Sequence, residues 1–216
     1  NTAAAFALPE KFDTSRNYEI TFWAKNDTNQ TQVDIYKKRS YIIFSNAVTI
    51  CKGSTIIGHH GTIVMGYNSY VGENGLLVCH KRIELGKCTA MGWNSSCYDS
   101  NFHFVLRDGE RFIRDCVSPV KLGNYIWCGN SVTIGPGSVI PDYSTVASHS
   151  LVNKDFSHIT TKGNLFTGTP AVLKKVTLFH PFIWNPKMER MLHNYFDEGE
   201  NNGIFELPED YPEAPY

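Results

Sequence analysis

Apolar residues recur at every sixth position between residues 122 and 152. The positions in this register are Leu122, Cys128, Ile134, Ile140, Val146 and Val152. Because 42% of the chain is apolar, six hits in one register would arise by chance roughly once in 200 trials. A helix with 3.6 residues per turn would spread these positions round its surface, whereas short strands joined by tight turns keep them on one side. The period therefore predicts a parallel β-helix.

A second series of positions agrees with that prediction. Small or β-branched residues lie four places after the first five apolar positions, at Ile126, Val132, Ser138, Ser144 and Ser150. Glycine directly follows the first three apolar positions, at Gly123, Gly129 and Gly135. Small residues suit corners at which one turn of backbone lies close to the next.

Several short motifs in and after this region resemble a known family. They are LeuGly at 122–123, IleTrpCysGly at 126–129, IleGlyProGlySer at 134–138, ValAlaSerHisSer at 146–150, AsnLysAsp at 153–155 and GlyThrProAla at 168–171. Over roughly residues 47–176 the chain resembles the hexapeptide-repeat acetyltransferases, in the group that acetylates sugar hydroxyls. A narrower resemblance is to the capsular polysialic acid O-acetyltransferases. The resemblance implies a left-handed parallel β-helix, acetyl-CoA as acetyl donor, a saccharide acceptor and a homotrimer with active sites between subunits.

The expected organisation is mainly β. It comprises an N-terminal β cap (1–46), the β-helix acetyltransferase domain (47–176) with one protruding loop (98–119), and a C-terminal helix and tail (177–216). In the cap, the alternation of apolar and polar residues over 18–24 predicts a strand, and Val33 with Ile35 predicts a strand that returns.

Two irregularities and one helix complete this outline. The apolar step lengthens to eight between Ile57 and Met65 and again between Leu77 and Leu85, which predicts two bulges stacked on one edge. An apolar face predicts a helix that starts at Pro186. That helix has Asn185 as N-cap, Gly199 as stop and Met188, Met191, Leu192, Tyr195 and Phe196 on the apolar face.

Composition narrows the functional classes. The 216 residues carry a net charge of −1, which does not favour nucleic acid or an anionic membrane surface as partner. No apolar run approaches the ~20 residues of a membrane span, and no signal peptide is visible. The chain does not begin with Met, which suggests that residues precede it. Six cysteines without a CxxC pair predict reduced packing residues in a cytoplasmic protein.

The interruption over 98–119 is the main candidate for chemistry, because long loops within compact folds are usually functional. In the resembling family this loop carries the catalytic histidine, and the matching segment from Asp99 to His103 assigns that role to His103. A neutral imidazole, with an ordinary pKa of about 6.5, can accept a proton from a hydroxyl as the oxygen attacks a thioester. Asp99 is the nearest candidate to orient it. The alternative is a loop histidine with a purely structural hydrogen bond.

Trp127 follows the inward-facing Ile126, so strand geometry predicts that its indole points outward. It would then form a wall of the active site, as the family motif implies, or pack against a neighbouring subunit. Cys128 occupies a sixth position and is expected to be a core residue rather than a nucleophile.

The resemblance also implies a site for acetyl-CoA along a groove between subunits. The residues in the matching positions are Gly129, Ser148, Asn153 and Lys154, with Lys174 or Lys175 at a phosphate. His149 stands where the family usually has glycine. Ordinary solvated surface is the alternative for the lysines.

Basic residues near the loop suggest an anionic saccharide, because arginine matches the planar geometry of a carboxylate. They are Lys81, Arg82, Arg107, Arg111 and Arg114. Local salt bridges with Asp108, Glu110 and Asp115 would explain the arginines of the loop equally well.

Three other functions remain in view. An N-acetyltransferase acting on an amino sugar nucleotide would use His103 in the same way. A non-catalytic β-helix scaffold would have no need of His103 or Trp127. A zinc carbonic anhydrase of similar fold needs three imidazoles, and none of the eight histidines forms the His-x4-His pair of that family. No metal site is therefore predicted.

Overall fold

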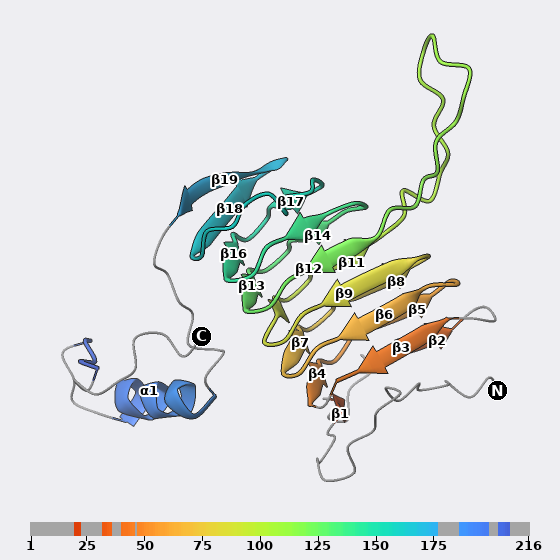
Figure 1. Cartoon of the computed structure of the whole chain (residues 1–216). Helices are drawn as coiled ribbons and strands as arrows, with labels where there is room; N and C mark the ends of the chain where they lie inside the picture. Colours follow the sequence, from red (N-terminus) through yellow and green to blue (C-terminus); the bar gives the residue numbers. More distant parts are fainter. Residues whose placement is uncertain are drawn as a thin grey trace. The chain divides into compact units, whose positions relative to one another are not determined.

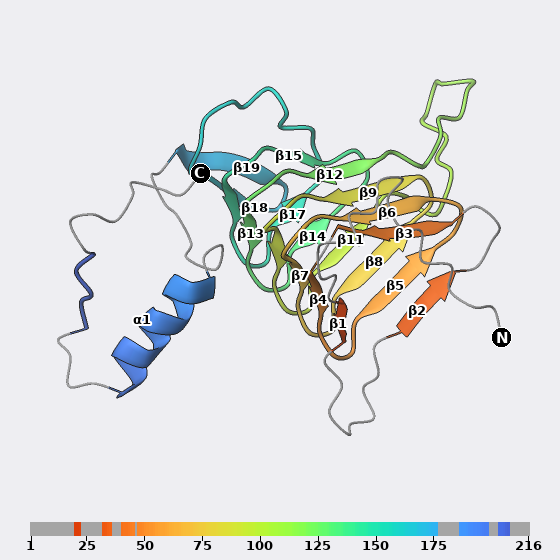
Figure 2. The same ribbon diagram turned by 60° about the horizontal axis from the view of Figure 1, so that its bottom comes forward.

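The chain winds as a three-sided, left-handed parallel β-helix, shown in two views in Figures 1 and 2. The structure is a computed structural model that describes residues 20–22, 32–35, 40–45, 47–176, 186–198 and 203–207. Each circuit contributes one strand to each of three faces, which we number in the order in which the chain meets them from Tyr41 onward. The sequence-based prediction of the fold is confirmed.

The faces consist of short strands. The first face contains β3 (Tyr41–Phe44), β6 (Thr62–Met65), β9 (Arg82–Leu85), β12 (Val120–Leu122) and β15 (Val139–Ile140). The second face contains β1 (Ile20–Phe22), β4 (Val48–Ile50), β7 (Ser69–Val71), β10 (Ala90–Met91), β13 (Ile126–Cys128), β16 (Ser144–Val146), β18 (Asn164–Gly168) and β19 (Ala171–Val176). The third face contains β2 (Gln32–Ile35), β5 (Thr55–Gly58), β8 (Leu76–Cys79), β11 (Ser96–Tyr98), β14 (Thr133–Ile134) and β17 (Leu151–Val152).

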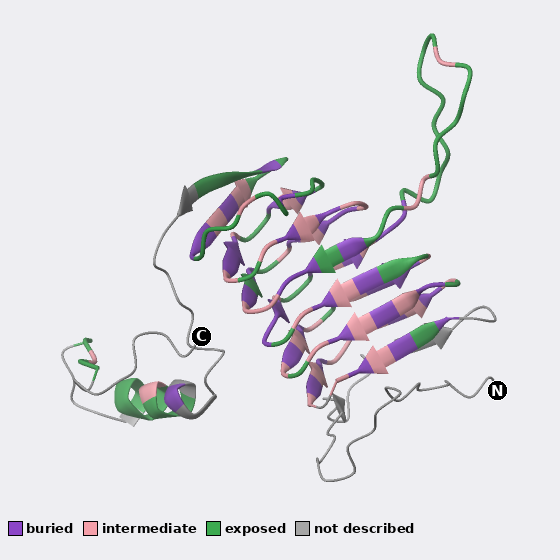
Figure 3. Ribbon diagram, viewed as in Figure 1, coloured by how far each residue is buried: buried purple, intermediate pink, exposed green. Residues whose placement is uncertain are grey.

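The six apolar positions of the sequence register form the core of the last two complete circuits. Leu122 and Ile140 lie on the first face, Cys128 and Val146 on the second, and Ile134 and Val152 on the third; all six are at most 1% exposed. Figure 3 shows buried residues alternating with more exposed ones along the strands. The sixfold period therefore reflects one inward side chain at the same place on each face.

Strand pairing shows how the insertions fit the helix. Trp127 pairs with Thr145, 18 residues further on, which is three hexads. Ala90 pairs with Trp127, 37 residues further on, so this circuit holds 19 residues more than the regular one (37 − 18). The extra residues form the loop between β11 and β12 that projects in Figure 1.

The N-terminal strands belong to the β-helix. β1 pairs with β4 on the second face and β2 pairs with β5 on the third, both in parallel. The expected pair of strands is therefore present, but the two strands join different faces instead of forming a hairpin. Parallel pairing starts at Ile20, ahead of the expected start of the repeat at residue 47. The remaining residues of the expected first strand lie outside the described residues.

The two eight-residue steps stack on the same corner, as expected. Both lie between the third and first faces, and the rings of His59 and His80 stack there with centroids 4.6 Å apart. We call this edge the third corner; the first corner joins the first and second faces, and the second corner joins the second and third.

A second compact unit, residues 179–216, contains α1 (Pro186–Glu198), which confirms the expected helix. Asn185 and Gly199, its expected cap and stop, lie outside the described residues. Within the unit, the hydroxyl of Tyr195 donates a 2.9 Å hydrogen bond to the carbonyl of Ile204. Of the helices in the described ranges, none has the length and apolar character that crossing a membrane requires.

Two glycines, Gly86 at the first corner and Gly135 at the third, give a test of the packing. A Cβ on Gly86 would meet the backbone of Gly123 in the next circuit, whereas a Cβ on Gly135 would have only ordinary contacts. Gly86→Ala should therefore lower the free energy of unfolding by roughly 2–3 kcal/mol, because the circuits must move apart. Gly135→Ala, the matched control, should change it by less than about 1 kcal/mol. Urea unfolding measures both, and equal effects would contradict the packing described here.

Candidate active site

The loop between β11 and β12 leaves the third corner as two arms held together at their base. Ser100 and Val117 form an antiparallel bridge, and the amide of Asn101 donates to the carbonyl of Cys116 at 2.9 Å. His103 lies beyond this bridge and is exposed to solvent. Its imidazole makes no hydrogen bond within the part of the chain that the structure describes, so it is accessible to a substrate or to another subunit.

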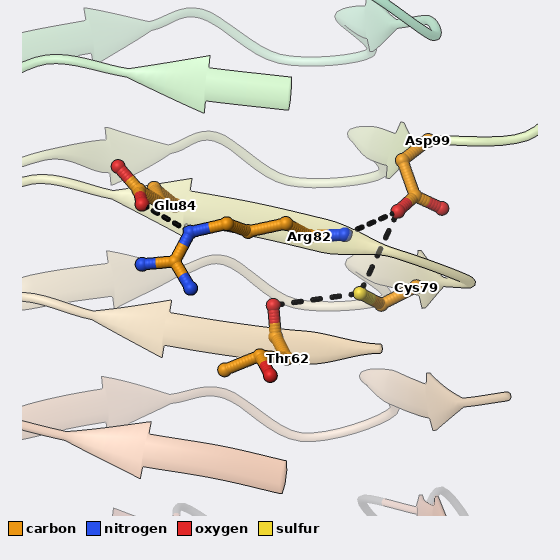
Figure 4. Close-up of polar contacts among 5 residues, drawn as sticks. All are labelled: Thr62, Cys79, Arg82, Glu84 and Asp99. Atoms are coloured by element: carbon orange, nitrogen blue, oxygen red, sulfur yellow. Dashed lines mark hydrogen bonds and ion pairs between the residues drawn. The ribbon is translucent and has the colours of Figure 1, made fainter. Parts of the chain in front are cut away.

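Asp99 fixes the root of the loop. Its side chain is fully buried and accepts hydrogen bonds from three consecutive backbone amides of the previous circuit: His80 (2.7 Å), Lys81 (2.6 Å) and Arg82 (2.7 Å). Figure 4 shows Asp99 together with Arg82 and Cys79, whose thiol lies 3.7 Å from the carboxylate. Among the described residues, the carboxylate contacts these groups rather than His103. Its observed role is to anchor the loop, and direct orientation of His103 stays a prediction.

His80 is the residue near this site that sequence reasoning missed. Its ring lies between His59, which it stacks on, and Phe102, whose ring it meets edge-on at 5.7 Å between centroids. Its Nε2 atom is buried, and no hydrogen-bond partner for it lies within the described residues. A buried polar atom without a partner costs about 1–3 kcal/mol and is often found at functional sites. The stacking of the two eight-residue steps was the only sequence signal that pointed to it.

Trp127 lies in the middle of β13, between the buried residues Ile126 and Cys128, and its side chain is 37% exposed. The expected outward direction is confirmed. Its strand partners on the second face are Ala90 and Thr145, whose small side chains are buried beside the partly exposed indole.

One protomer does not bring Trp127 and His103 together. Trp127 is on the second face, while the loop with His103 leaves the third corner, which is the edge opposite that face in the three-sided helix (Figure 2). A site that contained both residues would therefore need two copies of the chain.

The residues expected to hold acetyl-CoA lie near the last circuits. Gly129 and Ser148 lie at the second corner, where the Ser148 hydroxyl accepts a hydrogen bond from the amide of Asn130 at 3.0 Å. Asn153 and Lys154 follow β17 at the third corner, and both are exposed. The two pairs thus border the third face on its opposite sides.

The remaining residues of this predicted site lie on β19 and at the second corner. Lys174 is exposed on β19, and the side chain of Lys175 lies outside the described residues. His149 has a φ of 60°, in the left-handed region that favours glycine, and its ring is exposed. Asn74, Asn94 and Ser131 adopt the same conformation at the second corner, where an earlier circuit has Gly53, so this corner accepts residues other than glycine.

The basic residues proposed for an anionic acceptor divide into two groups. Arg114 pairs with Glu110 at 2.7 Å and Arg82 pairs with Glu84, so local salt bridges account for these two. Lys81, Arg107 and Arg111 are exposed, and their charged groups have no ion-pair partner in the described ranges.

The cysteines are packing residues. Cys128 is fully buried and burial raises the pKa of its thiol to about 12, which makes it a poor nucleophile at neutral pH, as expected. Burial, and then the charge of Asp99, raises the pKa of Cys79 to about 12. No group of three or more potential metal ligands occurs within the described parts of the chain.

Comparison with known proteins adds to this geometry. No protein-family model matches the chain. The galactoside O-acetyltransferase of Escherichia coli (strain K12) is 24% identical over 156 residues, which are 68% of this chain and 72% of that protein.

Two solved structures have a similar fold. The polySia-specific acetyltransferase NeuO has a TM-score of 0.52 at 14% identity, with 75% of this chain and 80% of NeuO covered. AntD, an N-acyltransferase from Bacillus cereus in complex with dTDP and 3-hydroxybutyryl-CoA, has a TM-score of 0.54 at 14% identity, with 83% and 87% covered. This chain has the fold of these acyltransferases. At such identities the likeness establishes the fold, and the reaction must be argued from the site.

The anchoring role of Asp99 can be tested. In Asp99→Asn one carboxylate oxygen becomes an NH₂ group that faces backbone donors, so we expect the free energy of unfolding to fall by about 2–4 kcal/mol. The amides of residues 80–82 should exchange with deuterium faster than in the wild type. The matched control is Asp115→Asn, because the Asp115 carboxylate is exposed and, among the residues that the structure describes, accepts from the amide of Val117 alone. Unchanged exchange at residues 80–82 in Asp99→Asn would contradict this role.

Proposed function

We propose that the protein is an acetyl-CoA-dependent O-acetyltransferase that transfers an acetyl group to a hydroxyl of a saccharide. The observation that carries this proposal is the exposed His103 on the long loop that interrupts an otherwise regular β-helix. An imidazole held clear of its own protomer by an anchored loop can reach a bound acceptor. The similarity to a galactoside O-acetyltransferase supports a sugar hydroxyl as the group that is acetylated.

The proposed chemistry is a direct transfer in a ternary complex. Acetyl-CoA supplies the acetyl group as a reactive thioester. As the hydroxyl oxygen of the acceptor bonds to the carbonyl carbon of the thioester, His103 accepts the hydroxyl proton. When the carbon–sulfur bond then breaks, His103 returns this proton to the thiolate of CoA. Backbone amides would stabilise the oxyanion that forms on the carbonyl oxygen. General base catalysis of this kind contributes about 10²- to 10⁴-fold to the rate.

The residues that would hold acetyl-CoA fit an elongated, anionic molecule. Gly129 and Ser148 at the second corner offer a surface with little side-chain bulk. Lys154 and Lys174 are exposed and can pair with phosphate groups as point charges. Asn153 lies beside Lys154 and can donate or accept a hydrogen bond.

We place the active site between two subunits of a homotrimer, in a cytoplasmic protein. Trp127 and His103 lie on opposite sides of one protomer, so a wall formed by Trp127 can serve His103 only from a neighbouring copy. The six large apolar residues that the loop exposes also suit contact with a second copy: Phe102, Phe104, Val105, Leu106, Phe112 and Ile113.

We propose an anionic saccharide, such as sialic acid in a capsular polysaccharide, as the acceptor. Lys81, Arg107 and Arg111 are the charges around the loop that local salt bridges leave available. The fold shared with a polySia-specific acetyltransferase is consistent with this choice. The N-acyltransferase AntD has a similar fold, so the alternative acceptor is an amino sugar nucleotide, which would be acetylated on its nitrogen.

The first test is acetyl transfer from acetyl-CoA to polysialic acid, neutral oligosaccharides and amino sugar nucleotides, followed by release of free thiol. We expect polysialic acid to be acetylated, and His103→Ala to lower kcat by about 10²- to 10⁴-fold because the general base is lost. His193→Ala is the matched control, since His193 lies on α1 in the second compact unit. Transfer that survives His103→Ala would remove this mechanism, and transfer to amino sugars alone would favour the N-acetyltransferase.

A mixture of two inactive variants tests the shared active site. His103→Ala and Trp127→Ala are each expected to lose activity, the second by at least roughly tenfold. When the two are unfolded together and refolded at equal amounts, about a quarter of the sites should contain both native residues, because each residue is intact in half of the subunits. Recovery of about a quarter of wild-type activity is expected. No recovery in mixed trimers would place both residues in one protomer or exclude one of them.

A further inference from the structure

A groove lies at the first corner, across the first face from the root of the loop that carries His103. It has a volume of about 600 Å³ and runs across five successive circuits, from Ser45 to Asp142. Its lining includes Tyr67, Glu84, Lys87, Lys121, Asn124 and Asp142. Adjacent strands are about 4.8 Å apart, so four steps between circuits give the groove a length of about 19 Å. Its volume lies within the range of ligand-binding sites.

Glycines form the floor of this groove. Gly66, Gly86 and Gly123 follow one another at the same place in consecutive circuits, and a Cβ on each would meet an atom of the next circuit. The floor therefore carries no side chains. The walls come from outward residues of the first face on one side and from residues of the corner on the other.

The acidic groups of the groove are already engaged within the protein. Glu84 pairs with Arg82. Asp142 accepts hydrogen bonds from the backbone amide of Asn124 at 2.8 Å and from its side-chain amide at 3.0 Å. The side-chain oxygen of Asn124 in turn accepts from the amide of Lys87 at 3.0 Å. These contacts leave few acceptors available to a ligand.

The basic groups remain available. The Lys121 side chain is exposed, and its ammonium group makes no ion pair or hydrogen bond among the described residues. The ammonium of Lys87 lies 4.9 Å from the centre of the Tyr125 ring, and a hydrogen bond with the Tyr125 side chain raises the pKa of this lysine. An ammonium has three N–H groups, so Lys87 stays charged and can still donate to a ligand. Tyr67 adds an aromatic ring that is 52% exposed. The groups offered are thus two cations, a phenol and a ring face.

We propose that this first-corner groove is a non-catalytic binding site for an acidic saccharide chain, a site that retains the polymer beside the active centre. This inference rests on the proposed function. Lysine ammonium groups would bind the carboxylates of the chain, and the exposed ring of Tyr67 would contact the apolar face of a sugar.

The position of the groove favours a long ligand over a monomer. β9 spans the first face, with Arg82 at the third corner beside the root of the loop and Glu84 at the groove. At about 3.3 Å per residue, the two steps from Arg82 to Glu84 separate these places by roughly 7 Å. One extended chain can therefore occupy both. A polymer that binds at both places dissociates more slowly than one bound at a single place, even though neither contact is stronger by itself.

The test measures binding separately from catalysis. Retardation of the protein in native gels that contain polysialic acid, without acetyl-CoA, gives the affinity for the polymer. In the double variant Tyr67→Ala/Lys121→Ala the dissociation constant should rise about tenfold, since a ring contact and a charge contact are both lost. The KM for the polymer should rise by a similar factor relative to the KM for a disialic acid acceptor.

A matched double variant controls for exposed residues of the same types. Tyr41→Ala/Lys52→Ala removes a tyrosine that is 44% exposed and a lysine whose side chain is 39% exposed, neither of which lines the groove. We expect it to bind polysialic acid as the wild type does, and Tyr67→Phe/Lys121→Arg to retain most of the affinity.

Three results would overturn the inference. The first is that polysialic acid retards the groove variant as much as the wild type. The second is that neutral dextran retards the wild type as much as polysialic acid does. The third is that the two substitutions of the groove variant convert an oligomeric wild type into monomers, which would show that a second copy covers the groove. Because the gels contain no acetyl donor, a failure of the proposed acetyl transfer would leave the binding result interpretable.

Discussion

Close approach of backbone to backbone at the corners is the constraint on which this structure depends. Successive circuits hydrogen-bond in parallel, which fixes their spacing, and the chain must turn three times per circuit within that spacing. Gly86 and Gly92 illustrate the consequence, because a Cβ on either would meet the backbone of Gly123 or Gly129 in the following circuit. Small residues at these places let the faces stay in register, and the inward apolar side chains then stack into one continuous core.

The same constraint decides where function can be placed. Inward positions are filled by the core, and the points of closest backbone approach require glycine, so chemistry is left to outward side chains and insertions. Trp127 is of the first kind and His103 of the second. Asp99 joins the insertion to the scaffold, since its carboxylate satisfies three backbone amides that the widened third corner leaves without strand partners. Because Asp99 anchors the loop to a rigid β-helix, the loop that carries the accessible side chain of His103 starts from a fixed position.

Much of this arrangement could be predicted from the sequence because the repeat is local. Six residues suffice to define a strand and a turn, so the positions from Leu122 to Val152, the outward Trp127 and the interruption before Val120 are all visible in the chain itself. Contacts between circuits are less visible, because their partners lie 17 to 37 residues apart and leave no periodic signal. The amides that bind Asp99 and the stacking of His80 on His59 are of that kind. For the same reason the sequence did not predict that β1 and β2 belong to different faces. Alternation of apolar and polar residues identifies a strand but does not identify the strand that pairs with it.

The insertion between β11 and β12 leaves the register of the scaffold intact. The strands that follow it pair with the strands that precede it, Val120 with Ile83 and Ala90 with Trp127, as if the loop were absent. The scaffold therefore places no requirement on the length of the loop, only on the two ends held together at Ser100 and Val117. A fold of this kind can exchange one such segment for another at little cost in stability, so new acceptor preferences can arise by replacing a single stretch of chain while the circuits around it remain unchanged.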